Sequence, residues 1–271
     1  MFESIIDNRS KGETTLRKTQ LVELYLLQIL DEICKQNNLR YFLVGGTLIG
    51  AMRHNGFIPW DDDIDVGMLK PDFEKFLEIA GKHLPEGVVL QHPNDAYSTV
   101  TFAKLRDQKS FFGEPNTSVG APHGIFVDIF PYEKMPNLPY AFVYRLVRWR
   151  SGTFRRWRFP LLKQRQSIVA KLADCVKAVI WKTGYLGACV LWRGLCILFP
   201  GRGWHMAPES EFPNRANEEQ LFPTKEHLFE GLNFPIPNDW EWVLKTEYSN
   251  WRELPPEADR VCHTKLIIPE L

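Results

Sequence analysis

Asp61, Asp62, Asp63 and Asp65 fall within five positions of the chain. From Asp63 onward acidic and apolar residues alternate, which is the periodicity of a strand with Asp63 and Asp65 on one face. Two carboxylates at such positions lie about 6–7 Å apart and repel each other unless a cation lies between them. Mg²⁺ and Mn²⁺ prefer oxygen ligands of this kind. The pattern predicts a metal site, with Asp61 as a further ligand and Asp62 as an outward-facing or structural residue.

A third carboxylate is expected from a later strand. Asp128 is the single acid in the apolar sequence Phe126–Phe130, and burying it without a partner would be costly. A third acid would complete a two-metal site. We therefore predict that Asp63, Asp65 and Asp128 are catalytic and that, with Asp61, they hold two Mg²⁺ or Mn²⁺ ions. The plainer interpretation is that these aspartates are surface charges, helix caps or loop residues.

A pair of glycines precedes the aspartates. A short apolar strand predicted over residues 41–44 ends at Gly45 and Gly46, where the backbone can approach a phosphate without interference from a Cβ atom. Thr47 is the predicted N-cap of a short helix over residues 48–53. We expect Gly45, Gly46 and Thr47 to bind phosphate.

Three cationic side chains are further candidates for phosphate contacts, namely Arg53, Lys104 and Arg106. Lys104 and Arg106 alternate on one face of a predicted strand, so both can reach the same site. The alternatives are a solvated helix end for Arg53 and an exposed strand face for the other two. His54 and His123 are interpreted as structural residues.

Hydrophobic periodicity predicts alternating helices and strands. A helix is expected over residues 16–37, and Pro71 begins another that runs to about residue 83. Further strands are predicted over residues 63–68, 88–91, 99–105 and 124–130. This order predicts an α+β fold with a mixed β-sheet flanked by helices.

The composition is that of an ordinary globular protein. The 271 residues are 44% hydrophobic and 24% charged, with zero formal net charge, so the overall field does not favour nucleic acid. The five cysteines form no C-x-x-C pair, which indicates reduced thiols in a cytosolic setting. The first 15 residues lack the apolar region of a signal peptide, and no spanning helix is expected.

Residues 140–203 are strongly basic, with thirteen Lys or Arg residues and Asp174 as the single acid. Aromatic residues are interleaved with these cations. The segment can be interpreted as a helical subdomain with a solvated basic face, as a surface that binds an anionic membrane, or as a surface that binds single-stranded nucleic acid. Apolar stretches at 176–180 and 186–199, broken by single basic residues, fit interfacial helices better than a nucleic-acid groove. No nucleic-acid partner is therefore expected.

The predicted organisation has three parts. Residues 1–136 are expected to form the catalytic core, residues 137–210 a basic and aromatic helical insertion, and residues 211–271 a C-terminal segment that packs back on the core. For the insertion, association with a membrane surface and a solvated basic face both stay open.

Three motifs together resemble the LicD family, which includes fukutin and fukutin-related protein. The first spans residues 43–67, from Leu-Val-Gly-Gly-Thr to Asp-Ile-Asp-Val-Gly, and the second spans residues 123–131. The third comprises Phe229-Glu230-Gly231, Pro235-Ile236-Pro237, Tyr248 and Trp251. The resemblance covers residues 20–135 and 225–256.

The resemblance implies a nucleotidyltransferase-like fold and a phosphotransferase that depends on a CDP-alcohol. The implied reaction moves a phospho-alcohol, typically phosphocholine from CDP-choline, to a hydroxyl of a surface glycan such as lipopolysaccharide, capsule or teichoic acid. Asp63 and Asp65 match the family's metal-binding pair, Asp128 its third acid and Asp61 a further acid. A lipid-linked acceptor would place the chain in the cytoplasm, at the inner face of the cytoplasmic membrane.

Two alternatives stay open at this point. The same acids would serve nucleotidyl transfer to a small hydroxylated molecule, which releases pyrophosphate instead of CMP. The scaffold could also be a non-catalytic module that binds a glycan or a nucleotide.

Overall fold

The computed structural model describes residues 2–98, 100–114, 120–162, 167–206, 216–248, 250–260, 262 and 266–271. In this part of the chain a seven-stranded sheet has the order β1-β2-β6-β4-β3, with β7 paired to the far half of β6 and β8 paired to β7. β2 and β6 run parallel and the other neighbours run antiparallel, so the sheet is mixed. Its strands are β1 Tyr41–Leu43, β2 Ile64–Leu69, β3 Val88–Gln91, β4 Ala103–Asp107, β6 Phe126–Pro136, β7 Pro200–Met206 and β8 Ala216–Asn217.

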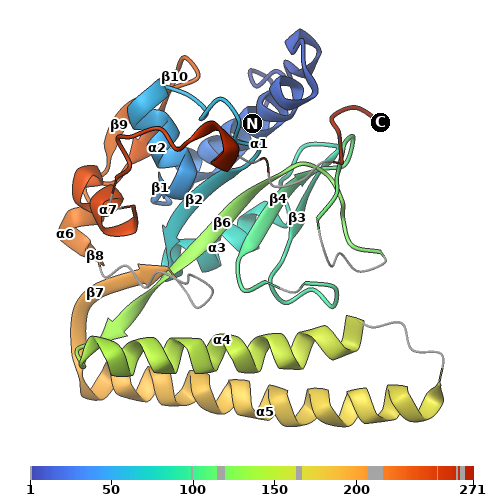
Figure 1. The fold of residues 1–271 in the computed structure, drawn as a ribbon, viewed down its shortest axis with the longest axis vertical. Helices are drawn as coiled ribbons and strands as arrows, with labels where there is room; N and C mark the ends of the chain where they lie inside the picture. The colour runs from blue at the N-terminus through green and yellow to red at the C-terminus, as the bar shows by residue number, and fades with distance from the viewer. Residues whose placement is uncertain are drawn as a thin grey trace.

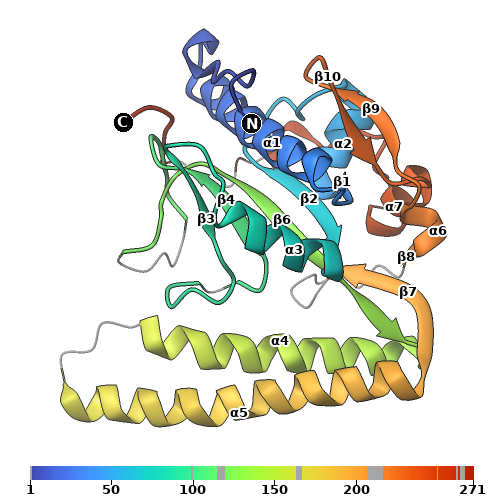
Figure 2. The same cartoon turned by 180° about the vertical axis from the view of Figure 1, so that it is seen from behind.

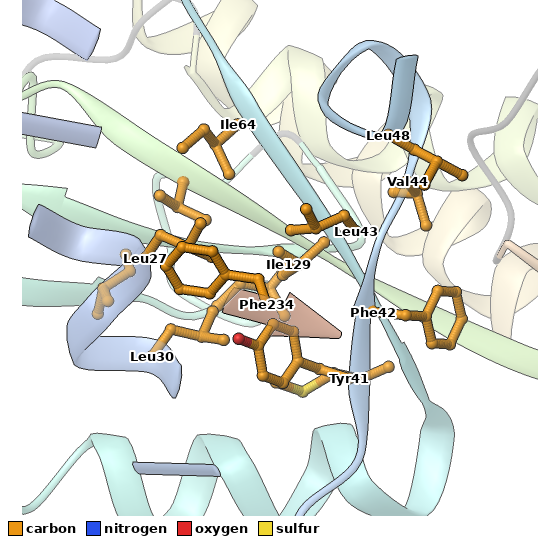
Figure 3. Close-up of a cluster of buried hydrophobic side chains, with 14 of the residues drawn as sticks. Leu27, Leu30, Tyr41, Phe42, Leu43, Val44, Leu48, Ile64, Ile129 and Phe234 are labelled. Atoms are coloured by element: carbon orange, nitrogen blue, oxygen red, sulfur yellow. The ribbon is translucent and has the colours of Figure 1, made fainter. Parts of the chain in front are cut away.

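Helices α1 (Thr15–Gln36) and α3 (Lys70–Ala80) cover one face of this sheet (Figures 1 and 2). Apolar residues at helical spacing on α1, including Leu27 and Leu30, meet inward side chains of the strands such as Ile64 and Ile129 (Figure 3). The prediction of an α+β fold with a mixed sheet flanked by helices is confirmed.

The predicted elements match the observed ones with shifts at their ends. The strand predicted over 99–105 is β4, and Thr99 lies outside the described residues. The strand predicted over 124–130 continues to Pro136, because its second half gains β7 as a partner. That pairing joins segments about 70 residues apart, which local periodicity cannot reveal.

Helix α2 (Gly45–His54) differs from its prediction in a way that matters for the site. The N-cap is Val44 and the helix already begins at the glycine pair, so the prediction of Thr47 as the N-cap is wrong. Instead, the backbone N–H of Asp65 donates a hydrogen bond of 2.8 Å to Oγ1 of Thr47. The hydroxyl therefore fixes α2 against β2.

The segment after β7 folds back on the core beside α2 and β1 (Figure 1). It contains α6 (Glu218–Leu221), the hairpin of β9 (Lys225–Phe229) and β10 (Leu232–Ile236), and α7 (Trp240–Glu247). Close to the termini, η1 (Arg9–Lys11) precedes α1, and η2 (Glu257–Asp259) precedes β11 (Ile267–Ile268), which pairs with β5 (Phe111–Phe112).

Two long antiparallel helices, α4 (Tyr140–Leu162) and α5 (Ile168–Leu198), form a hairpin at one edge of the molecule (Figures 1 and 2). The helical prediction for the insertion is confirmed for these two helices, whereas β7 extends the central sheet within the same stretch. The division into three parts stays a prediction.

His205 on β7 is fully buried beside Trp192, with their ring centroids 5.2 Å apart. Burial, assisted by the nearby Arg150, lowers the pKa of this imidazole to about 4. The folded protein therefore keeps His205 neutral at pH values where the unfolded chain, with a pKa of about 6.5, takes up a proton.

We expect the fold to lose stability through this residue as the pH falls from 6.5 toward 4. The unfolded state binds more protons in this window, so protonation favours unfolding, by about 2 kcal/mol between pH 7.5 and pH 5. Urea unfolding of wild type and His205→Phe at both pH values measures the effect, and the exposed His83→Gln serves as control. Equal pH dependence in wild type and His205→Phe would contradict this assignment.

Candidate active site

Strand pairing brings Asp65, Asp128 and Lys104 side by side. Asp65 on β2 pairs with Asp128 on β6, and Lys104 on β4 pairs with the same Asp128. Because directly paired residues point to the same face of a sheet, the two carboxylates and the ammonium group share one face. The burial pattern continues upstream, with Asp61 and Asp63 half-buried like Asp65.

Asp62 does not share the half-buried setting of Asp61, Asp63 and Asp65. It is fully buried, as is the neighbouring Ile64. The outward-facing alternative for Asp62 is therefore wrong, and a structural role remains.

The N-terminus of α2 faces the aspartates. Gly45 adopts a left-handed backbone with φ of 59°, and a Cβ atom there would lie 3.0 Å from Oδ2 of Asp65. A Cβ atom on Gly46 would lie 2.9 Å from Oδ2 of Asp61. The glycine pair thus lets the first N–H groups of α2, at the positive end of the helix dipole, approach the carboxylate face.

Burial and mutual repulsion leave the two paired aspartates in different electrostatic settings. The pKa of Asp65 is raised well above its ordinary value by burial and by Asp63, Asp128 and Asp61. The pKa of Asp128 is raised to about 6 by burial, against the opposing effect of Lys104. Burial therefore disfavours the charged form of both carboxylates, and neighbouring acids add to this effect at Asp65.

Lys104 is the buried cation of the site. Its Nζ lies 2.8 Å from Oδ1 of Asp128 and 3.1 Å from Oε1 of Glu114, and 3.4 Å from the ring centroid of Phe126. The alternative of an exposed strand face is wrong for Lys104, which is 4% exposed. A role in phosphate binding stays a prediction.

The other two predicted cations are held by protein partners. Arg106 is 1% exposed, donates to Oε1 of Gln91 and to the carbonyl oxygen of Gly124, and forms an ion pair with Glu114. It is not on an exposed strand face either.

Arg53 donates to the carbonyl oxygens of Trp251 and Glu253, at 3.1 and 3.2 Å, so it is not merely a solvated helix end. Both guanidinium groups are thus bound by protein groups, and their predicted contacts with phosphate stay predictions. Of the two histidines taken as structural, His54 is exposed and accepts a hydrogen bond from Arg53, whereas His123 stacks on Phe111.

Sequence reasoning missed a polar face of α1 that touches the aspartate run. Gln20 and Glu23, three residues apart, lie on one side of the helix and are both buried. Gln20 donates a hydrogen bond of 3.0 Å to the carbonyl oxygen of Asp61. Burial and the four aspartates of the run raise the pKa of Glu23 well above its ordinary value. The sequence signal that could have revealed this face is the spacing of Gln20 and Glu23, an amide and an acid three residues apart beside the apolar stripe of the helix.

The C-terminal segment supplies two more contacts. Glu230, in the turn between β9 and β10, forms an ion pair of 2.6 Å with Arg17 and accepts a hydrogen bond from the backbone N–H of Phe57. The hydroxyl of Tyr248 lies 3.7 Å from the position of a Cβ atom on Gly45, and burial raises the pKa of this phenol. The third motif therefore supports the loop that carries the aspartates.

The aspartates have the oxygen ligands that a divalent cation prefers, but their side chains are not arranged around a common point. In the described part of the chain, no three Asp, Glu, His or Cys side chains surround a common point as a metal site requires. The carboxylates nevertheless offer hard oxygen ligands, and a cation would relieve the repulsion that raises the pKa of Asp65. Because Lys104 contacts both oxygens of Asp128, an ion bound there requires the ammonium group to share the carboxylate or to move.

A mixed sheet with clustered acids beside a glycine-initiated helix defines a nucleotidyltransferase-like protein. Residues 38–163 match the family model described as LicD/FKTN/FKRP, nucleotidyltransferase domain. Over 267 residues the chain is 30% identical to the lipopolysaccharide cholinephosphotransferase LicD of Haemophilus influenzae, an alignment that covers 92% of this chain and 96% of that protein. A shorter match, 35% identical over 66 residues, links 24% of the chain to 12% of human ribitol 5-phosphate transferase FKRP.

The chain belongs to the LicD family. Membership confirms the resemblance and the transferase class that it implied.

Proposed function

We propose that this protein transfers phosphocholine from CDP-choline to a hydroxyl group of a surface glycan. The register that sets Asp65 beside Asp128, in front of the N-terminus of α2, carries the proposal. It gathers oxygen ligands and helix N–H groups on one face, and phosphoryl transfer needs mainly positioning and charge neutralisation. Choline as the alcohol rests on the Haemophilus influenzae relative, whose name states cholinephosphotransferase activity on lipopolysaccharide.

In the proposed reaction the acceptor hydroxyl oxygen attacks the phosphorus that carries choline. A new P–O bond to the glycan forms, the P–O bond to the bridging oxygen breaks, and CMP leaves with the electron pair. In this proposal Asp128 accepts the hydroxyl proton, and the N–H groups of Gly45, Gly46 and Thr47 bind phosphate oxygens. Arg53, Lys104 and Arg106 add positive charge around the leaving group.

Asp61, Asp63, Asp65 and Asp128 are the residues that would hold Mg²⁺ or Mn²⁺. When bound, such an ion supplies Lewis-acid stabilisation of the charge on the diphosphate. We place the reaction in the cytoplasm, at the inner face of the cytoplasmic membrane, where an acceptor glycan on a lipid carrier would be reached.

A donor screen tests the proposal. Purified protein with Mg²⁺ or Mn²⁺ and a choline-free glycan acceptor is incubated with CDP-choline, CDP-ethanolamine, CDP-glycerol or CDP-ribitol, and the CMP released is quantified by chromatography. We expect release from CDP-choline that depends on the acceptor. Pyrophosphate release from a nucleoside triphosphate would assign nucleotidyl transfer instead. Nucleotide or glycan binding without turnover would assign a binding module.

Gly46→Ala is expected to slow CMP release by about 10²-fold. The added methyl would lie 2.9 Å from Oδ2 of Asp61 and would push that carboxylate away from the other acids. Alanine suits a helix, so the fold should keep its stability. Gly187→Ala on α5, where a Cβ atom meets nothing within 4 Å, is the matched control and should retain full activity. Unchanged turnover in Gly46→Ala would contradict the role given to this close approach.

A further inference from the structure

Helix α5 is the outer helix of the hairpin: α4 lies between most of its length and the body of the molecule, and its C-terminal end contacts β6 and β7 (Figures 1 and 2). It packs inward through Asp174, Ala178, Ala188 and Trp192. With 31 residues, α5 is roughly 45 Å long. One side of this long helix therefore packs against the rest of the protein, and the opposite side is exposed.

The opposite side is apolar along nearly the whole helix. Its exposed large side chains are aliphatic and follow one another at intervals of one, three or four residues, with two longer intervals of six residues, from 180 to 186 and from 191 to 197. They are Ile168, Val169, Leu172, Val176, Val179, Ile180, Leu186, Val190, Leu191, Ile197 and Leu198, each at least 45% exposed. We call this set the α5 stripe. A contiguous apolar surface of this length is unusual on a free protein surface and indicates a binding face.

Positive charge borders the α5 stripe. Lys171, Lys182 and Arg193 are exposed and follow one another at intervals of 11 residues, which is close to three helical turns, so they form a line along one flank. Lys177 is exposed on the other flank. The single acid of residues 140–206, Asp174, is buried, so no carboxylate of α4 or α5 offsets these charges at the surface.

The aromatic residues of α5 do not belong to this surface. Tyr185 packs against Phe154 and Trp157 of α4 at centroid distances of 5.3 and 5.7 Å, and Trp181 lies under the guanidinium of Arg156. A single-stranded nucleic acid would need exposed aromatic rings for stacking, and the α5 stripe is aliphatic. A second copy of the chain would bring two like-charged flanks together.

An aliphatic face flanked by Lys and Arg suits the boundary between anionic headgroups and acyl chains. In the described part of the chain, no helix has the length and apolar character required to cross a bilayer. We propose that the α5 stripe docks the protein on an anionic lipid bilayer, with α5 lying in the plane of the headgroups and its cations on the anionic lipids. This inference extends the membrane location given under the proposed function, and its test needs neither donor nor acceptor, so the two can fail separately.

Vesicle flotation tests the proposal. The full chain is mixed with vesicles of phosphatidylcholine alone or with 30% phosphatidylglycerol, at low and high salt. We expect binding to the anionic vesicles at low salt and much weaker binding to neutral ones. Lys171→Gln/Lys182→Gln/Arg193→Gln should bind the anionic vesicles roughly 100-fold more weakly, since each cation near such a surface contributes about fivefold. Absence of wild-type binding at low salt would overturn the proposal.

A second pair of variants separates insertion from simple charge attraction. Val176→Glu/Val190→Glu places two acids in the α5 stripe at positions 59% and 70% exposed, so the fold should tolerate them. Vesicle binding should be lost, whereas the control Ile6→Glu/Leu254→Glu, at 65% and 53% exposure, should bind like wild type. Retained binding in the stripe variant would overturn the proposal. So would a stable wild-type dimer, measured by sedimentation velocity, that the same variant dissociates.

Discussion

Asp65→Asn is expected to lower the rate of CMP release by at least about 10²–10³-fold. The substitution removes the negative charge that faces Asp128 across the β2–β6 pairing, and with it one of the proposed metal ligands. Initial rates with CDP-choline, acceptor and saturating Mg²⁺ measure the effect. The matched control is Asp259→Asn, the same change at an exposed position of η2, which should leave the rate unchanged.

The same variant distinguishes loss of chemistry from loss of fold. Burial and neighbouring acids raise the pKa of Asp65, so the folded state holds its proton more tightly than the unfolded state. Ionisation of Asp65 therefore reduces stability as the pH rises above its unfolded pKa, and asparagine cannot ionise. Metal-free Asp65→Asn should unfold at a temperature equal to or above that of metal-free wild type at pH 7.5. An active variant, or one inactive only because it is unfolded, would contradict the assignment.

Lys104→Met is expected to lower the free energy of unfolding by about 3–5 kcal/mol at pH 7.5 in the absence of metal. The substitution keeps most of the side-chain volume but leaves the buried carboxylate of Asp128 without its ammonium partner, whereas the half-buried Glu114 keeps its ion pair with Arg106. Urea unfolding monitored by circular dichroism measures the loss. The difference from wild type should shrink toward pH 5, because Asp128, with its raised pKa, is then increasingly protonated and neutral.

Lys134→Met is the matched control for this prediction. Lys134 is exposed, lies over the ring of Trp204 and is 3.8 Å from Glu218, so its loss should cost no more than about 1 kcal/mol. Added Mn²⁺ should restore part of the stability of Lys104→Met, since a cation bound at Asp128 would replace the lost charge. A Lys104→Met variant as stable as Lys134→Met would show that the buried cation does not balance these acids.

Local patterns were sufficient for the parts of the site that are close in sequence. Alternation predicted Asp63 and Asp65 on one strand; β2 begins at Ile64, so Asp63 lies directly before that strand. The apolar context of Asp128 marked it as an unusual acid. The start of α2 was predicted wrongly because the sequence of two glycines and a threonine is typical of a turn followed by the N-cap of a helix. In the structure their N–H groups form the first turn of the helix, and Thr47 binds the backbone of Asp65.

The rest of the site depends on contacts between distant segments. Arg106 was predicted to contact phosphate, with an exposed strand face as the alternative, yet Gln91, Gly124 and Glu114 bind its guanidinium group and it is 1% exposed. Glu23 was not among the predicted site residues, yet it is buried, and burial together with the aspartate run raises its pKa. This burial depends on how α1 packs against the loop that carries the aspartates. The periodicity of the local sequence cannot predict such a contact.

Mn²⁺ binding followed by electron paramagnetic resonance tests the central claim most directly. In this titration bound Mn²⁺ loses the sharp spectrum of the free ion, so occupancy is read without turnover. We predict that wild type and Asp259→Asn bind Mn²⁺, and that Asp65→Asn and Asp128→Asn bind it at least about tenfold more weakly. Undiminished binding in both site variants, or CMP release by wild type in excess chelator, would contradict a metal site formed by these aspartates.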